Sequence, residues 1–161
     1  MPTDRPLRTA TPADIPVLAR HRRLMFEEMA RLNGLRPDPE KLGEMEALYT
    51  GHLRNHLPDG SLRAWIAEQE GQVVASGALS LLDWPATPSN LCSQLGLLHS
   101  VYTLPAYRRR GLAHAIAMEA IEFGRQAGLK RLVLHASEAG RPLYISLGFK
   151  PADNEMRLAL D

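Results

Sequence analysis

Helical periodicity dominates the first third of the chain. Apolar residues recur every three or four positions between Ile15 and Leu32, so they fall on one stripe of a helix. Thr11-Pro12 is typical of a helix start, and Asn33-Gly34 is typical of a helix end. A second helical region is predicted from Pro39 to about Leu57. A short strand, Leu7–Ala10, precedes the first helix.

The middle of the chain changes to runs that favour strands. We predict strands from Leu62 to Glu68, from Gln72 to Leu82 and from Leu95 to Thr103. Glu70-Gly71 has turn chemistry and joins the first two of these strands as a hairpin. Gly77 lies inside the second strand, where a glycine marks a bulge or a close approach of the backbone.

The last third alternates between helix and strand. A helix opens after Gly111 and ends at Gly128, and a strand from Arg131 to Ala136 follows it. This strand–helix–strand unit is long enough for a parallel crossover. A short helix from Pro142 to Leu147 and a final strand from Met156 to Leu160 complete the order β-α-α-β-β-β-α-β-α-β. Because no repeat or linker is present, we predict one α/β domain over residues 1–161.

Composition and charge exclude several classes of function. The 161 residues carry a formal net charge of +1 and one cysteine. The even charge argues against a general nucleic-acid binder, and the lack of an apolar run of about 18 residues argues against a membrane span. A single cysteine excludes an internal disulfide, and no secretory signal is visible. We therefore expect a cytoplasmic protein without a metal, nucleic-acid or membrane partner, and a homodimer is left open.

The run from Tyr107 to Ala113 carries the strongest chemical signal. Three arginines and a glycine follow a strand and open an amphipathic helix. Backbone N–H groups and the helix dipole then converge on one spot, which favours a bound phosphate or pyrophosphate. A solvated basic turn is the alternative interpretation.

This turn and a second segment resemble the GCN5-related N-acetyltransferase (GNAT) superfamily. Arg108, Gly111 and Ala113 fill the family signature Gln/Arg-x-x-Gly-x-Gly/Ala. The preceding run, Val101–Tyr107, is similar to the end of the family's fourth strand. The segment Ser137–Phe149 is similar to the family pattern Asn-x-x-Ala-x-x-Leu-Tyr-x-x-x-Gly-Phe, with serine replacing the asparagine. The resemblance covers essentially the whole chain.

The resemblance implies a mixed, splayed sheet that holds acetyl-CoA in a V between the fourth and fifth strands. It implies that backbone N–H groups of residues 109–113 bind the pyrophosphate and that residues 101–103 pair with the pantetheine arm. Tyr144 is then placed beside the sulfur as the general acid. The cofactor-binding residues expected on this basis are Val101, Tyr102, Thr103, Arg108, Arg109, Arg110, Gly111, Leu112, Ala113, His114 and Ser137.

The general base and the acceptor site carry no motif of their own. His99 shares a strand face with Val101, and an imidazole titrates near neutrality, so it is our candidate base. A hydrogen-bonded histidine of the sheet is the alternative for His99, and a core tyrosine is the alternative for Tyr144. Glu27 and Glu28 on the first helix are candidates for binding a cationic amine or relaying its proton, against a solvated helix face.

Together these features predict an acetyl-CoA-dependent N-acetyltransferase. It would transfer the acetyl group directly to a primary amine in a ternary complex, and the acceptor is expected to be a small molecule or a peptide amine. Three alternatives are left open: a non-catalytic acyl-CoA-binding module, an enzyme for another acyl-CoA, and an enzyme for an oxygen acceptor.

Overall fold

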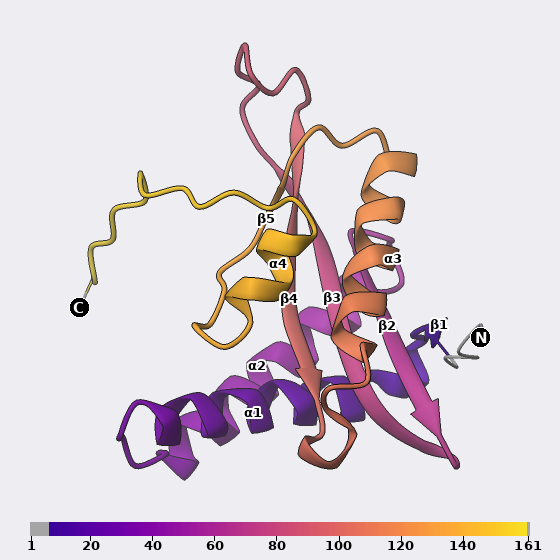
Figure 1. The fold of residues 1–161 in the computed structure, drawn as a ribbon, viewed down its shortest axis with the longest axis vertical. Coiled ribbons are helices and arrows are strands. Elements are labelled where there is room, and N and C mark those ends of the chain that lie inside the picture. The colour runs from indigo at the N-terminus through magenta and orange to yellow at the C-terminus, as the bar shows by residue number, and fades with distance from the viewer. Residues whose placement is uncertain (1–6, 161) are drawn as a thin grey trace.

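Five strands form one sheet in the order β1-β2-β3-β4-β5 in the computed structural model, which describes residues 7–160 (Figure 1). The strands are β1 (Leu7–Thr9), β2 (Leu62–Gln69), β3 (Gln72–Asp83), β4 (Gln94–Thr103) and β5 (Leu132–Val133). Neighbouring strands are antiparallel except β4 and β5, which run parallel. The helices are α1 (Ile15–Leu32), α2 (Pro39–His56), α3 (Leu112–Gln126) and α4 (Arg141–Ser146). None of the helices in the described part has the length and apolarity needed to cross a membrane.

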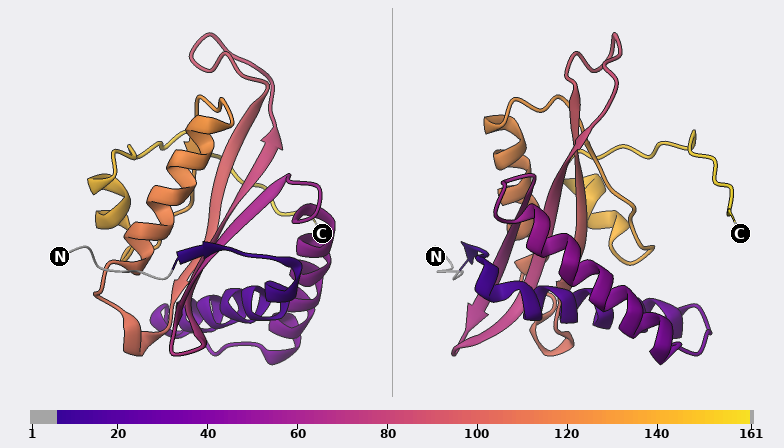
Figure 2. Two further views of the ribbon diagram at one scale, coloured as in Figure 1. Left: turned by 90° about the vertical axis from the view of Figure 1, so that its right-hand side faces the viewer. Right: turned by 180° about the vertical axis from the view of Figure 1, so that it is seen from behind.

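The helices cover opposite faces of the sheet because strand side chains alternate between its two faces. Along β2, Ala64 and Ile66 join a buried cluster with α1 and α2, whereas Trp65 and Ala67 join a second cluster with α3. Figure 2 shows α1 and α2 together on one side of the sheet and α3 on the other. The predicted α/β class with a mixed sheet flanked by helices is therefore confirmed.

A bulge interrupts β4 where it passes Gly77 of β3. The register shifts by one there, so two residues of β4, Ser100 and Val101, face the single residue Gly77. Ser100 takes a positive φ of 56°. A Cβ atom at Gly77 would lie 2.6 Å from Ile116 Cγ2 and 3.2 Å from Val101 Cγ2. The prediction that Gly77 marks a bulge or a close approach is thus confirmed on both counts.

The parallel strands β4 and β5 separate after only two residue pairs. Gly96 pairs with Leu132 and Leu97 pairs with Val133, and no further pairs join the two strands in the described chain. The rest of β4, as far as Thr103, has an open edge on that side. This divergence is the V-shaped opening that the resemblance implied, and it determines where a ligand can enter.

The predicted elements differ from the structure mainly near the C-terminus. The fifth strand is limited to Leu132–Val133 instead of Arg131–Ala136, because β4 turns away from it. The predicted final strand, Met156–Leu160, does not form, and the segment pairs with none of the strands of the described chain. Its residues are exposed, and the segment runs away from the body of the molecule (Figure 1). At the other end, a single 3₁₀ turn, Pro12–Asp14, precedes α1.

Candidate functional site

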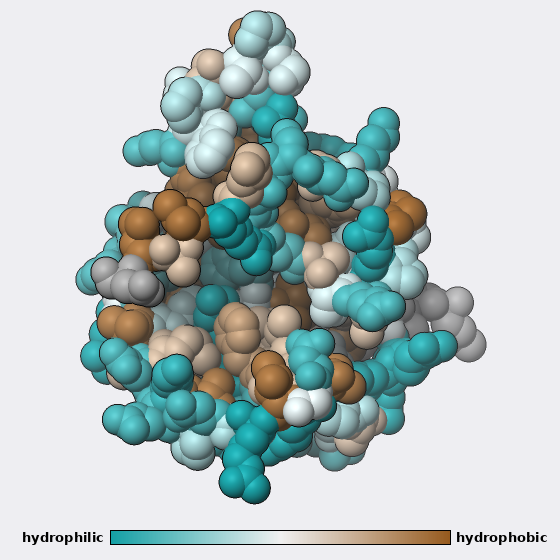
Figure 3. All heavy atoms as spheres, turned by 90° about the vertical axis from the view of Figure 1, so that its left-hand side faces the viewer, coloured by the Kyte–Doolittle hydropathy of each residue, from teal (hydrophilic) through white to brown (hydrophobic). Residues whose placement is uncertain are grey.

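A cavity of about 1350 Å³ opens where β4 and β5 diverge, and the surface is hollowed on the face drawn in Figure 3. Sites for one small molecule usually measure about 300–1,000 Å³, so this cavity has room for two substrates side by side. Most site residues predicted from the sequence line it: Glu28, His99, Val101, Tyr102, Thr103, Arg108, Arg109, Gly111, Leu112, Ala113, His114, Ser137 and Tyr144. Glu27 and Arg110 are not among the lining residues.

The turn before α3 has the backbone geometry of an anion cradle. Arg109 has a φ of 64° and Gly111 a φ of 76°. Alternation of ordinary and left-handed backbone turns successive N–H groups toward one point, and such concave turns bind anions. The first N–H groups of α3, on Leu112 and Ala113, add donors that have no partner within the helix. The local structure fits a phosphate or pyrophosphate at this position.

The Arg108 side chain links this turn to α1 and to the end of β4. Its guanidinium donates to both carboxylate oxygens of Glu28, at 2.6 and 2.5 Å, and its Nε donates to the Thr103 carbonyl at 3.0 Å. The hydrogen bonds from Arg108 lower the pKa of Glu28, so its carboxylate is ionised. Arg110 donates to the Ala106 carbonyl outside the cavity. Of the three arginine side chains, only Arg108 and Arg109 line the cavity.

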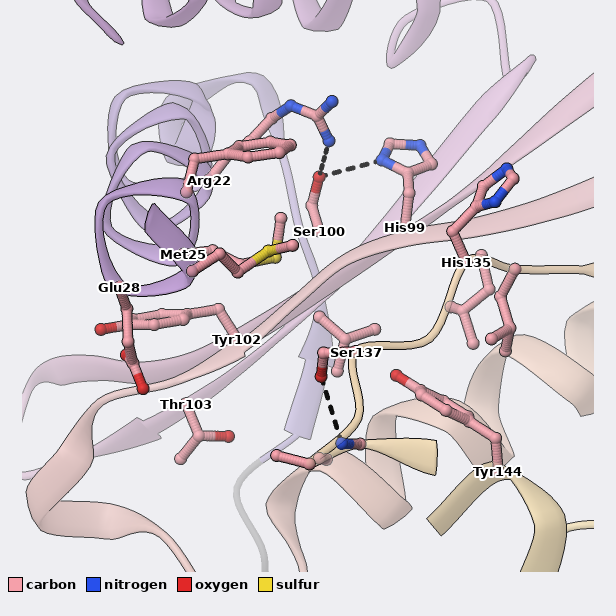
Figure 4. A pocket seen from close by; sticks show the side chains of 18 of the residues that line it. Arg22, Met25, Glu28, His99, Ser100, Tyr102, Thr103, His135, Ser137 and Tyr144 are labelled. Atoms are coloured by element: carbon pink, nitrogen blue, oxygen red, sulfur yellow. Dashed lines mark hydrogen bonds between the residues drawn. The ribbon is translucent and has the colours of Figure 1, made fainter. Parts of the chain in front are cut away.

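Tyr144 lies across the cavity from β4, on the short helix α4. Its hydroxyl points into the opening (Figure 4), and its ring makes an edge contact with Phe149 at 5.8 Å between centroids. Burial raises the pKa of Tyr144, so the phenol stays protonated and is a hydrogen-bond donor at neutral pH. Ser137, which precedes α4, accepts a hydrogen bond from the Gly140 N–H at 3.1 Å and thereby shapes the turn into the helix.

His99 is held between two serine hydroxyls at the other end of the cavity. Its Nε2 lies 2.8 Å from Ser80 Oγ and its Nδ1 lies 2.9 Å from Ser100 Oγ. Ser100 also accepts a hydrogen bond of 2.8 Å from Arg22 Nη1, as Figure 4 shows. Burial, followed by the nearby charge of Arg22, lowers the pKa of His99 to about 3. The imidazole is therefore neutral throughout the physiological range.

The two glutamates proposed for the acceptor are both engaged by arginines. Glu27 accepts from Arg23 at 3.1 Å, and Glu28 is held by Arg108. The neighbouring Arg22 was not singled out from the sequence, although it lines the cavity. A signal was present: the helical stripe of α1 runs through positions 15, 18, 22, 25, 29 and 32, and Arg22 is the one charged residue on it.

Comparison with known proteins agrees with this geometry. The model of the acetyltransferase (GNAT) family matches residues 26–149. The chain is 36% identical over 92 residues to the uncharacterized N-acetyltransferase YjgM of Escherichia coli. This match covers 55% of the present chain and 52% of YjgM. It is also 36% identical over 66 residues to the glucosamine 6-phosphate N-acetyltransferase of Trypanosoma brucei brucei, covering 41% of this chain and 45% of that protein. The chain thus spans about half the length of the curated relatives it matches.

Two solved structures resemble the chain over almost its whole length. A GCN5-related N-acetyltransferase from Ralstonia eutropha has a TM-score of 0.86 at 30% identity, and the match covers 96% of the present chain and 97% of the Ralstonia chain. A predicted acetyltransferase from Clostridium acetobutylicum, solved with acetyl-CoA, has a TM-score of 0.85 at 27% identity, and the match covers 95% of the present chain and 94% of the Clostridium chain. Because the family model matches more than half of its residues, the chain belongs to the GNAT acetyltransferase family.

Proposed function

We propose that this protein is an acetyl-CoA-dependent N-acetyltransferase that transfers the acetyl group directly to a primary amine. The observation that carries the proposal is the open edge of β4, which has an anion cradle at one end and the Tyr144 hydroxyl facing it. A strand edge suits an amide-bearing arm, and the cradle suits a pyrophosphate. The Clostridium relative solved with acetyl-CoA supports the choice of co-substrate.

Acetyl-CoA supplies an acyl group that is activated as a thioester. The acceptor, an ammonium ion in solution, loses one proton to become the nucleophile and loses a second after its nitrogen has attacked the thioester carbonyl. The C–S bond breaks and the departing sulfur takes up one proton, so one proton is released in each turnover. The cavity is large enough for both substrates together, which supports a ternary complex over a covalent intermediate on the protein. N–H groups on the open edge of β4 would stabilise the negative oxygen that forms during attack.

Tyr144 is proposed as the donor of the proton to the sulfur. Its raised pKa keeps the phenol protonated before the reaction, and its hydroxyl faces the point where the strands diverge. A proton donor at the leaving group lowers the barrier to thiolate departure. Ser137 and Gly140 fix the start of the helix that carries it.

His99 is proposed as the group through which the amine proton leaves. Both candidate carboxylates of α1 are held by arginines, whereas His99 is neutral and lies between two hydroxyls that line the cavity. An imidazole with so low a pKa does not retain a proton. It would therefore pass the proton on through the serine hydroxyls or water.

The first prediction tests the function itself. The purified chain should bind acetyl-CoA in calorimetry and release CoA in a screen of amine acceptors. Gly111→Asp should abolish both, because a carboxylate would occupy the phosphate cradle. Gly34→Asp is a matched control, since Gly34 has a similar φ of 71° and its Cβ position is open. Binding without turnover on any amine would indicate a non-catalytic acyl-CoA-binding module, and turnover only with alcohols would indicate an oxygen acceptor.

A second prediction concerns the proton donor. Tyr144→Phe should lower kcat by about 10- to 1000-fold, because the leaving thiolate loses its acid. The affinity for acetyl-CoA, measured by calorimetry, should change little, because the ring keeps its packing. A variant with wild-type kcat would make Tyr144 a core residue.

The third prediction uses the pH profile. The pKa of His99 is lowered, so its neutral form is lost only as the pH falls toward about 3. The wild-type kcat/KM should therefore show no inflection near pH 6.5 from this residue, and His99→Gln should lower kcat about 100-fold at every pH. An inflection near 6.5 that His99→Gln removes would contradict the proposed neutral relay, and full activity in that variant would make His99 structural.

A further inference from the structure

Arg22 lines the acceptor end of the cavity without a carboxylate partner in the described chain, unlike the other arginines that α1 carries or contacts there. Arg23 pairs with Glu27 and Glu46, and Arg108 pairs with Glu28. Within residues 7–160, Arg22 has no carboxylate within ion-pair distance and one side-chain hydrogen bond, to Ser100. A partly buried guanidinium without a counterion is unusual, because burial of a charge is unfavourable unless the charge is paired.

The guanidinium of Arg22 is also held in a fixed position. Its central carbon lies 5.0 Å from the ring centre of Phe26 and 4.7 Å from that of Tyr49. These two cation–π contacts and the Ser100 hydrogen bond fix the plane of the group. Because a guanidinium has five N–H donors and Ser100 takes one of them, a fork of donors is left for a ligand.

The surroundings of Arg22 also suit an anion. His52 and His99 both line the cavity, and both have a lowered pKa. Burial is the main cause for each; the charge of Arg22 follows for His99, and the charges of His56 and then Arg22 follow for His52. Among the described residues, two acids line the cavity: Glu28 forms an ion pair with Arg108, and Glu44 is exposed. Glu27, outside the lining, is paired with Arg23. Figure 4 shows Arg22 across the opening from Ser137 and Tyr144, away from the segment expected to hold the cofactor.

We propose that Arg22 binds an anionic group on the acceptor, so that the acceptor is an amine that also carries a carboxylate or a phosphate. This inference rests on the proposed acetyltransferase function and names the class of its second substrate. A planar guanidinium binds either group through two parallel hydrogen bonds. The arrangement places the anion at the α1 end of the cavity, with the amine between it and the thioester.

The test uses matched pairs of acceptors that differ only in the anion: α-amino acids against their amides, and amino sugar phosphates against the free amino sugars. For the wild-type protein, kcat/KM should be at least about tenfold higher for the anionic member of one pair. Arg22→Gln should reduce that preference by about 10- to 100-fold, the range expected for a lost charged hydrogen bond. Because Arg22 also holds Ser100, activity with the neutral member can fall as well, but by about 10- to 100-fold less than with the anionic member, and affinity for acetyl-CoA should change little. Arg20→Gln, which removes an exposed charge from the same helix, is the control.

The outcomes separate the two proposals. Preference for carboxylates over phosphates, or the reverse, identifies the source of the anion. Turnover of neutral or cationic amines in preference to both anionic series overturns the anion site and leaves the acetyltransferase intact. Failure to acetylate any amine, with acetyl-CoA bound, overturns the proposed function instead. A preference that survives in Arg22→Gln assigns anion recognition to another residue.

Discussion

The site depends on one close packing contact, the approach of β4 to Gly77. Glycine allows the bulged residues Ser100 and Val101 to press against β3, with Ile116 of α3 packed on the same point. A bulge bends its strand and increases the local twist. β4 therefore turns away from β5 after two pairs, and the cavity occupies the space between them. A side chain at position 77 would push β4 and α3 away from β3, because its Cβ atom would clash with Ile116 and Val101.

The bulge also explains why polar groups gather at the acceptor end. Ser100 takes a left-handed backbone conformation there, which is unfavourable for a residue with a Cβ atom and persists only where its surroundings hold it. The hydrogen bonds that its hydroxyl makes with Arg22 and His99 supply such surroundings. Backbone strain, the neutral imidazole and the unpaired guanidinium are therefore parts of one arrangement.

Features encoded by consecutive residues could be predicted from the sequence. The turn before α3 needs only Arg109, Gly111 and the helix start, all of which lie within a few positions, and its backbone matches the prediction. The partner of Arg108 could not be predicted in this way, because Glu28 lies 80 residues away and only the packing of α1 against the sheet brings them together. The low pKa of His99 has the same origin, since burial and Arg22 both come from tertiary structure. The absent final strand shows the limit of local pattern: Met156–Leu160 has strand periodicity, but a strand also needs a partner for its backbone groups, and this segment pairs with no strand of the described chain.

The paired and unpaired arginines determine where positive charge lies along the cavity. Arg23 and Arg108 each hold carboxylates of α1, which removes the negative charges that would attract an ammonium ion. Arg22 and Arg109 keep their charge toward the opening, one at the acceptor end and one at the phosphate turn. A cavity that is positive at both ends and neutral between them favours a free amine over an ammonium ion next to the thioester. Because only the free amine carries the lone pair that attacks the carbonyl, the same charges that bind the two substrates also favour the reactive form of the nucleophile.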